Sequence, residues 1–373
     1  MNILVIGAGV IGAAIARALA ERGASVTVLD MRAPGRGASW ASAGVLAPYI
    51  EAHGDTPLLQ LGVRSLALFD DFIGRARDRS GRAIEYARPG TCEVALSDDE
   101  APRLTAAKAW LDAKGAASEW IDRRQLPNVE PAVSQAALGG LLIPAHGYAG
   151  VPSLIAALVR CAEIAGAVFE SAVEAIEVVS ARDFVQVRAG GREYRADHVV
   201  MAAGSWSSRV RVAGMAPLPV RPVKGQLLHL RWRHGTAPTR VVWSSDCYTV
   251  PWSDGTLLVG ATVEDVGFDE STTVAAAESL KAAAGALLPD AARADLLEAR
   301  AGLRPATPDG LPFIGALAEV PRVTVATGHF RNGVLLAPLT AAMVEALILD
   351  GRADAMMALT SPARLAARQG EGS

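Results

Sequence analysis

Cysteine and histidine are scarce in this sequence, and their spacing excludes several kinds of site. The three cysteines among its 373 residues, Cys92, Cys161 and Cys247, lie far apart and form no CxxC pair. Neither a disulfide framework nor a zinc site is therefore expected. The six histidines show no HxxxH or HxH spacing, so we predict no metal site. This cysteine usage fits a reducing compartment, and we expect a cytoplasmic protein.

An excess of charge of one sign is also missing. The 36 lysines and arginines nearly balance the 39 acidic residues, which leaves a formal net charge of −3. Such a balance gives no electrostatic reason to expect nucleic acid or an anionic membrane as a partner.

Uninterrupted apolar runs of membrane-spanning length are not found either. Met1–Leu19 lacks the basic start of a signal peptide and carries glycines that a signal peptide does not need. Residues 334–349 are interrupted by Pro338 and Glu345, and we interpret them as a buried helix. We therefore predict no integral membrane segment. Hydrophobic residues make up 51% of the chain, enough for a large core.

The residue pattern predicts an α/β fold. A strand at Asn2–Ile6, a glycine-rich turn, a helix at about Val10–Arg22 and a strand at Ser25–Asp30 form one βαβ unit. Strands without intervening helices from about residue 219 to 263 predict a mostly antiparallel sheet. Further helices are expected at 58–79, 101–114 and 152–165, and further strands at 91–96, 184–188, 197–202, 226–232, 247–251 and 256–260.

The turn of the βαβ unit carries a dinucleotide-binding fingerprint. Gly7, Gly9 and Gly12 match GxGxxG, and Asp30 ends the second strand. Gly7 allows the tight turn, Gly9 lets the backbone approach a pyrophosphate, and Gly12 lets the helix pack closely on the strand. The helix N-terminus attracts the phosphates, and Asp30 can accept hydrogen bonds from the adenosine ribose. The fingerprint alone does not separate FAD from NAD.

Several other segments follow in the order found in one flavoprotein family. With them the chain resembles the D-amino-acid oxidase (DAO) superfamily of FAD-dependent oxidoreductases from residue 1 to about 350. Within it, the chain most resembles the glycine oxidase branch of the thiamine pathway. The segments are Ser39–Gly44, Asp197–Ser207, Pro222–Gly225, Gly302–Pro305 and Gly328–Gly333.

The resemblance implies a Rossmann-like FAD-binding domain interrupted by a smaller α+β substrate domain with a mostly antiparallel sheet. The first comprises residues 1–88, 138–218 and 303–373, and the second residues 89–137 and 219–302. FAD should be bound non-covalently, because no cysteine lies near Gly302, where a relative tethers its flavin. The implied FAD-binding residues are Gly7, Gly9, Val10, Ile11, Gly12, Asp30, Met31, Ser39, Ser42, Ala43, Gly44, Val45, Val173, Ala203, Gly204, Trp206, His329, Phe330, Arg331, Asn332, Gly333, Val334 and Leu335.

The resemblance also implies a substrate site. Arg304 matches the arginine that binds the substrate carboxylate, a task for which a planar guanidinium is well suited. Tyr248 matches a tyrosine that hydrogen-bonds the substrate. Arg331 matches a second pocket arginine, although it could equally be a structural ion-pair partner.

The expected pocket departs from the pattern of the glycine oxidase branch. Val45 and Val263 stand where methionines are usual, which could widen the pocket. Asp246 replaces a histidine and either adds negative charge near the substrate or points to solvent. Glu51 matches an acidic position near the entrance.

The implied activity is oxidation of glycine or another small (D-)amino acid by hydride transfer to FAD, with O2 as the acceptor and hydrogen peroxide as a product. A homotetramer is common in the family. Two alternatives stay open at this point: a dehydrogenase that passes electrons to a quinone or carrier protein, and a flavin-binding subunit without turnover. The presence of both Arg304 and Tyr248 argues against the second.

Overall fold

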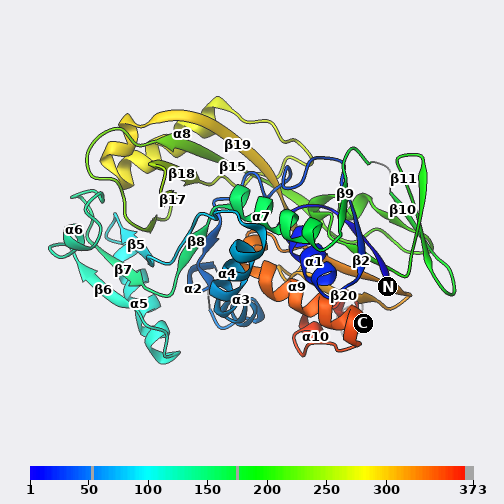
Figure 1. The fold of residues 1–373 in the computed structure, drawn as a ribbon. Helices are drawn as coiled ribbons and strands as arrows, with labels where there is room; N and C mark the ends of the chain where they lie inside the picture. The colour runs from blue at the N-terminus through cyan, green and yellow to red at the C-terminus, as the bar shows by residue number, and fades with distance from the viewer. Residues whose placement is uncertain (52–53, 174–175, 366–373) are drawn as a thin grey trace.

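The computed structural model describes residues 1–51, 54–173 and 176–365. Two large sheets lie at opposite ends of the molecule, joined by long strands, and the N-terminus lies at the end that holds the first sheet (Figure 1). The mixed α/β class predicted from the sequence is confirmed.

The first sheet has six strands in the order β20-β21-β13-β1-β2-β9. All neighbouring strands are parallel except β20, which pairs antiparallel with β21. The central strand β1 is almost wholly apolar and buried, as expected for a strand covered on both faces. The strands are β1 (Asn2–Ile6), β2 (Ser25–Leu29), β9 (Val168–Glu170), β13 (His198–Met201), β20 (Phe313–Leu317) and β21 (Val320–Thr327).

One face of this sheet is covered by helices. Helix α1 (Val10–Glu21) packs between α7 (Val151–Ile164) and α9 (Gly333–Asp350) (Figure 1). By length and composition α9 could cross a membrane, but 56% of it is buried inside the protein, in the core that α1 and α7 share. This is the buried helix expected at residues 334–349. Of the shorter helices, α3 (Pro57–Ala67) packs on α9, α4 (Phe69–Ser80) packs on α7, and α10 (Met357–Thr360) packs on β20.

The opposite face is covered by a small four-stranded sheet, β12-β11-β10-β14. Its strands are β10 (Glu177–Ser180), β11 (Val185–Ala189), β12 (Arg192–Ala196) and β14 (Arg211–Val212). The 3₁₀ helix η1 (Gly204–Arg209) follows β13 and turns the chain toward the second large sheet.

The second large sheet has eight strands in the order β19-β15-β18-β17-β16-β5-β7-β6. Every neighbouring pair is antiparallel except β16 with β5, so the expected mostly antiparallel sheet is present. Its strands are β5 (Thr91–Ala95), β6 (Glu119–Asp122), β7 (Gly139–Ile143), β15 (Arg221–Arg231), β16 (Val241–Trp243), β17 (Tyr248–Pro251), β18 (Thr256–Gly260) and β19 (Asp295–Ala306).

Short elements complete the fold. Helices α5 (Glu100–Ala113) and α8 (Val274–Leu287) pack on the eight-stranded sheet. A three-stranded sheet, β3-β8-β4, lies between the two halves. The remaining bounds are β3 (Val45–Leu46), β4 (Tyr86–Ala87), β8 (Gly147–Ala149), α2 (Pro48–Glu51), α6 (Leu126–Val129) and η2 (Pro289–Arg293).

Two expectations differ from the structure. The single helix expected at residues 58–79 is two helices, because Leu68 both ends α3 and begins α4. The expected division at residue 138 places residues 139–143 with the cofactor-binding part. In the structure this segment is β7, which pairs with β5 and β6 in the eight-stranded sheet. Pairing partners far away in the sequence, not local pattern, decide its place.

Three buried histidines should make the fold sensitive to mild acid. Burial lowers the pKa of His146 to about 3, of His198 to about 4 and of His329 to about 3. The unfolded chain binds protons near pH 6.5 and the folded chain does not, so the free energy of unfolding should fall as pH falls from about 6.5 to 4.5. The slope is about 1.4 kcal/mol per pH unit for each histidine. Urea unfolding at several pH values across this range measures the slope. The variant His146→Gln should show a shallower slope than the wild type. An equal slope would contradict the lowered pKa of His146.

Candidate functional site

The glycine turn after β1 is shaped by close backbone contacts. Gly7 has φ +108°, and a Cβ there would lie 2.4 Å from the carbonyl oxygen of Ala202. A Cβ on Gly12 would lie 1.8 Å from the Gly7 oxygen. Both positions therefore require glycine. At the start of α1, the Val10 amide donates to Ser39 Oγ at 3.0 Å, which holds the loop of residue 39 against the helix N-terminus.

Asp30 follows β2 and fixes the same turn from the other side. Its carboxylate accepts hydrogen bonds from the amides of Ala8, at 2.6 Å, and Arg32, at 2.8 Å. Burial raises the pKa of Asp30, and the two amide hydrogen bonds oppose that rise. The carboxylate thus lies at the C-terminal edge of the sheet, where a nucleotide binds in doubly wound folds.

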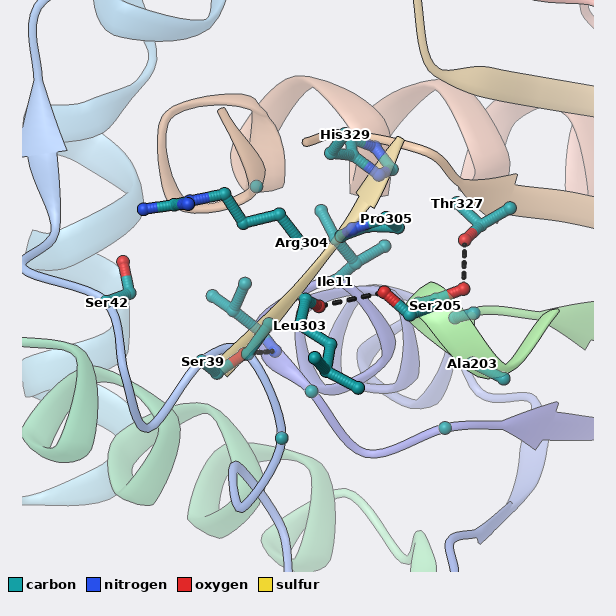
Figure 2. Close-up of a pocket in the computed structure, with 18 of the residues that line it drawn as sticks. Ile11, Ser39, Ser42, Ala203, Ser205, Leu303, Arg304, Pro305, Thr327 and His329 are labelled. Atoms are coloured by element: carbon teal, nitrogen blue, oxygen red, sulfur yellow. Dashed lines mark hydrogen bonds between the residues drawn. The ribbon is translucent and has the colours of Figure 1, made fainter. Parts of the chain in front are cut away.

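One continuous cavity begins at this edge and extends to the eight-stranded sheet. It has a volume of about 430 Å³, and residues as far apart as Asp30, Gly44, Gly204 and Arg304 line it. Figure 2 shows the part around the strand that carries Leu303, Arg304 and Pro305, with Ser39 and Ser42 on the facing loop. A cavity of this extent fits an elongated cofactor together with a small substrate.

Arg304 lies on β19 and reaches the cavity across β15. Its guanidinium donates to the carbonyl oxygens of Thr262, at 2.9 Å, and Lys224, at 3.3 Å. A Cβ on Gly225 would lie 2.1 Å from the Arg304 Nη2, so glycine at 225 makes room for the guanidinium. Burial lowers the pKa of Arg304, yet an arginine stays charged at neutral pH. In Figure 2 the side chain extends away from Ser205 and Thr327.

Tyr248 lies on β17 opposite Gly260 of β18. A Cβ on Gly260 would lie 2.4 Å from the tyrosine oxygen, so this glycine accommodates the phenol ring. Burial raises the pKa of Tyr248, with Arg304 and Arg331 close enough to oppose the rise. The hydroxyl is therefore protonated at neutral pH and can donate a hydrogen bond to a ligand. The Trp243 ring lies beside it, with the ring centroids 4.8 Å apart.

Arg331 forms an ion pair inside the cavity. It precedes α9, and its guanidinium contacts the carboxylate of Glu51 on α2 through two atoms, at 3.0 and 3.1 Å. The pair is mostly buried, with 29% of the Arg331 and 14% of the Glu51 side chain exposed. The guanidinium also lies 5.8 Å from the centroid of the Trp243 ring. The sequence left open whether Arg331 lines the pocket or serves as a structural ion-pair partner. The structure shows that it does both.

Hydroxyl groups join the halves behind the cavity. Ser205 Oγ donates to the Leu303 carbonyl oxygen at 2.8 Å (Figure 2). Ser207 Oγ donates to Thr327 Oγ1 at 2.9 Å. These bonds connect η1 to β19 and β21. His329 Nε2 lies 3.1 Å from Thr340 Oγ1, so this ring is held against α9.

The cavity lining includes the predicted FAD-binding residues except two. Gly12 does not line the cavity, because its role is the close contact with Gly7. Leu335 is 2% exposed and packs in the core beside Gly62. Val45, Glu51, Tyr248, Arg304 and Arg331 line the cavity as expected.

Two predicted pocket residues are not brought into the lining. Asp246 lies in the turn between β16 and β17 with an exposed side chain. Of its two alternatives, the structure shows the one in which it points to solvent, and its expected place among the pocket residues is corrected. Val263 is 61% exposed. Its neighbours Thr262 and Glu264 turn toward Gln226, and the alternation of side chains along an extended segment leaves Val263 on the other side.

Some lining residues were missed from the sequence. Trp243 pairs with Tyr248 across β16 and β17, but a three-residue strand gives too short a pattern to detect. Arg32 and Arg209 also line the cavity. No sequence motif identifies Arg32 or Arg209 as a lining residue. The only local indication is that Arg32 comes two residues after Asp30.

The geometry defines a class of protein before any comparison is made. A glycine turn at a helix N-terminus and an acidic residue at the end of the second strand form a dinucleotide site. The same cavity ends in a half-buried arginine, Arg304, and a tyrosine, Tyr248, which are suited to a small carboxylate. These residues fit FAD, because the bare backbone of Gly9 faces the cavity and the cavity reaches from Asp30 to Arg304.

Comparison with known proteins agrees with this class. The family described as DAO, FAD dependent oxidoreductase, matches residues 2–347. Glycine oxidase from Geobacillus kaustophilus is 33% identical over 93% of this chain and 92% of its own. A crystal structure of glycine oxidase from that organism superimposes with a TM-score of 0.91 over 97% of this chain and 98% of that one.

Two other relatives extend the comparison. The bifunctional protein ThiO/ThiG of Nostoc sp. is 32% identical over 95% of this chain, which corresponds to 54% of that protein. Iminodiacetate oxidase from Chelativorans sp. BNC1 is 25% identical, with a TM-score of 0.87 over 96% of this chain and 97% of that one. The chain therefore belongs to the DAO family of FAD-dependent oxidoreductases.

Room for the Arg304 guanidinium should be essential for binding a carboxylate. In Gly225→Ala the new methyl group occupies the position of the guanidinium, and Arg304→Ala removes the charge. Both variants should raise the Kd of a small carboxylate such as glycolate by at least about tenfold, because each removes a charge-assisted hydrogen bond to the ligand. Perturbation of the flavin spectrum measures this Kd, and FAD should stay bound.

Gly74→Ala is the matched control, since a Cβ there meets no neighbouring atom. An unchanged Kd in both Arg304→Ala and Gly225→Ala would remove Arg304 from the carboxylate site.

Proposed function

We propose that the protein oxidises glycine or another small (D-)amino acid. The overall reaction converts the amino acid, O2 and water into a 2-oxo acid, ammonia and hydrogen peroxide, with glyoxylate as the product from glycine. When bound, FAD would supply the redox chemistry as the acceptor of the hydride that leaves the substrate Cα. The observation that carries the proposal is Arg304: its guanidinium donates only to backbone carbonyls among the contacts of the described residues, so its charge is available to a carboxylate.

The protein side chains then act by orientation and not by proton abstraction. Arg304 would hold the carboxylate, and the Tyr248 hydroxyl would donate a second hydrogen bond to it. The described residues that line the cavity include one histidine, His329. Burial lowers the pKa of His329 to about 3. It is neutral at physiological pH and held near Thr340. A substrate with a neutral amine needs no base for hydride transfer, which fits this lining.

The pocket charges favour substrates with one carboxylate. Glu51 neutralises Arg331, so Arg304 supplies the net positive charge at this end of the cavity. Small substrates are favoured further by the rings of Trp243 and Tyr248, which lie side by side in the lining. Val45, where the branch usually has methionine, leaves an apolar wall with more space.

The names of the relatives support a metabolic role for the protein. One of them is a glycine oxidase and another is a bifunctional protein ThiO/ThiG, which supports a role in supplying glycine-derived material for thiamine synthesis. We further propose a cytoplasmic homo-oligomer, by analogy with the family. A dehydrogenase that passes electrons to a quinone or carrier protein is the alternative that the following experiment separates.

The activity can be tested by anaerobic reduction of the bound flavin. Glycine, sarcosine, D-alanine and D-proline are mixed in turn with the purified yellow protein, and the flavin absorbance is followed. At least one should bleach the flavin, and admission of air should restore the colour with formation of peroxide. Bleaching without rapid recolouring would indicate the dehydrogenase. No bleaching by any of the four would contradict the proposed substrate class.

The Glu51–Arg331 pair should set the preference for one carboxylate over two. In Glu51→Gln the charge of Arg331 is freed, so a substrate with a second carboxylate, such as D-aspartate or iminodiacetate, gains a partner. The ratio of kcat/KM for the dicarboxylate to that for glycine should rise by about tenfold, as expected for one new charge-assisted contact.

Asp295→Asn is the control, because Asp295 pairs with Arg233 at an exposed position. An unchanged ratio in Glu51→Gln would show that Arg331 does not face the substrate.

A further inference from the structure

A segment of the eight-stranded half crosses to the cofactor-binding half. Residues 264–271, here called the strap, follow β18 and precede α8. The strap begins with a bridge between Glu264 and Lys224 of β15. Its far part contacts residues that follow β2 and β13 of the six-stranded sheet. No residue of the strap lines the cavity, but the residues it contacts do.

Aromatic and cationic groups stack where the strap meets the cofactor-binding half. The Arg32 guanidinium lies 4.6 Å from the centroid of the Trp206 ring. That ring is 5.8 Å from the ring of Phe268 on the strap, and the Arg209 guanidinium lies 3.6 Å from the Phe268 centroid. Each contact has the geometry of a cation–π or aromatic pair. Phe268 therefore supports Trp206 and Arg209 from behind.

An ion pair fixes the end of the stack. Glu270 accepts from both terminal nitrogens of Arg32, at 2.9 and 2.5 Å. The side chains are 29% and 28% exposed, and this two-point geometry holds a guanidinium in one orientation. Arg32 follows Asp30 by two residues, and its amide donates to the Asp30 carboxylate. The strap thus controls the position of the segment at the end of β2.

The root of the strap is anchored by a buried lysine. Lys224 is 2% exposed, and its ammonium contacts Asp269 at 2.8 Å, Glu264 at 3.2 Å and the Ser271 carbonyl oxygen at 3.2 Å. Lys224 and Ser271 lower the pKa of Asp269 to about 2. A buried ammonium requires such partners because its desolvation is costly. The strap is therefore held in one place relative to β15.

The segment at the end of β2 is where the adenosine ribose lies in dinucleotide-binding folds. Arg32, Trp206 and Arg209 line the cavity at that end. We propose that the strap forms the outer layer of the adenosine part of the FAD site. Phe268 and Glu270 are positioning residues that hold this wall and slow the release of FAD. The proposal concerns cofactor retention and holds whichever amino acid is oxidised.

The test compares FAD with FMN, which has the same isoalloxazine ring but lacks the adenosine half. Holoenzyme is diluted and FAD release is followed by the rise in flavin fluorescence; apoprotein is titrated with FAD and with FMN. Glu270→Gln should release FAD on the order of tenfold faster, as expected for loss of one ion pair of this kind. Its affinity for FMN should equal that of the wild type.

Phe268→Leu keeps an apolar side chain and should also release FAD faster without changing FMN affinity. Asp265→Asn is the matched control on the same segment, because Asp265 pairs with Arg221 where both side chains are more than half exposed; it should behave as wild type. Thermal unfolding of the apoproteins verifies that each variant folds.

Wild-type FAD release in both Glu270→Gln and Phe268→Leu would overturn the proposal. An equal loss of FAD and FMN affinity would also overturn it, because the strap would then act on the whole fold and not on the adenosine end. Neither outcome bears on amino-acid oxidation, which flavin bleaching by substrate measures separately.

Discussion

The pairing of β15 with β19 is the constraint on which the site depends. The two strands run antiparallel from the far edge of the eight-stranded sheet to the cofactor-binding half. Where they approach the cavity, Gly225 lies opposite Gly302. A Cβ on Gly225 would collide with Arg304, and one on Gly302 would lie 2.8 Å from the Ala41 side chain. One glycine pair thus gives room to the Arg304 guanidinium and to the loop that follows the nucleotide turn.

The charges around the cavity follow from burial. Three cations near the cavity are removed from water to different extents: Arg304, Arg331 and Lys224. Different partners offset the desolvation cost of each. Lys224 is surrounded by two carboxylates and a carbonyl oxygen, and Arg331 has Glu51. Arg304 has only carbonyl oxygens among the described contacts. A carboxylate ligand completes the environment of Arg304 and of neither other cation.

The cofactor and substrate parts of the cavity are built by both halves of the chain. Hydroxyl groups of η1 connect to β19 and β21, while the strap connects the sheet-rich half to Arg32. Among residues 219–302, Trp243 and Tyr248 line the cavity, which they share with Asp30 and Gly44 of the cofactor-binding half.

Much of the site could be predicted from the sequence because its chemistry is local. The turn of Gly7 to Gly12 and the placement of Asp30 follow from backbone sterics within thirty residues. Arg304 and Tyr248 lie in short segments whose order resembles a known family, and both line the cavity. The antiparallel sheet was predictable as well, since strands joined by a tight turn pair with each other.

Tertiary structure alone decided the rest. Residue patterns show that a segment is buried but not what it is buried against, so the pairing of β7 with β5 and the exposure of Val263 could not be foreseen. For the same reason the two alternatives for Asp246 stayed open until its exposed position was known. The same holds for Glu51 with Arg331 and for Glu270 with Arg32, pairs separated by 280 and 238 residues. The sequence by itself determined the nucleotide turn and the chemical types at the site. Only folding determined which charges are neutralised, because that depends on contacts between segments far apart in the chain.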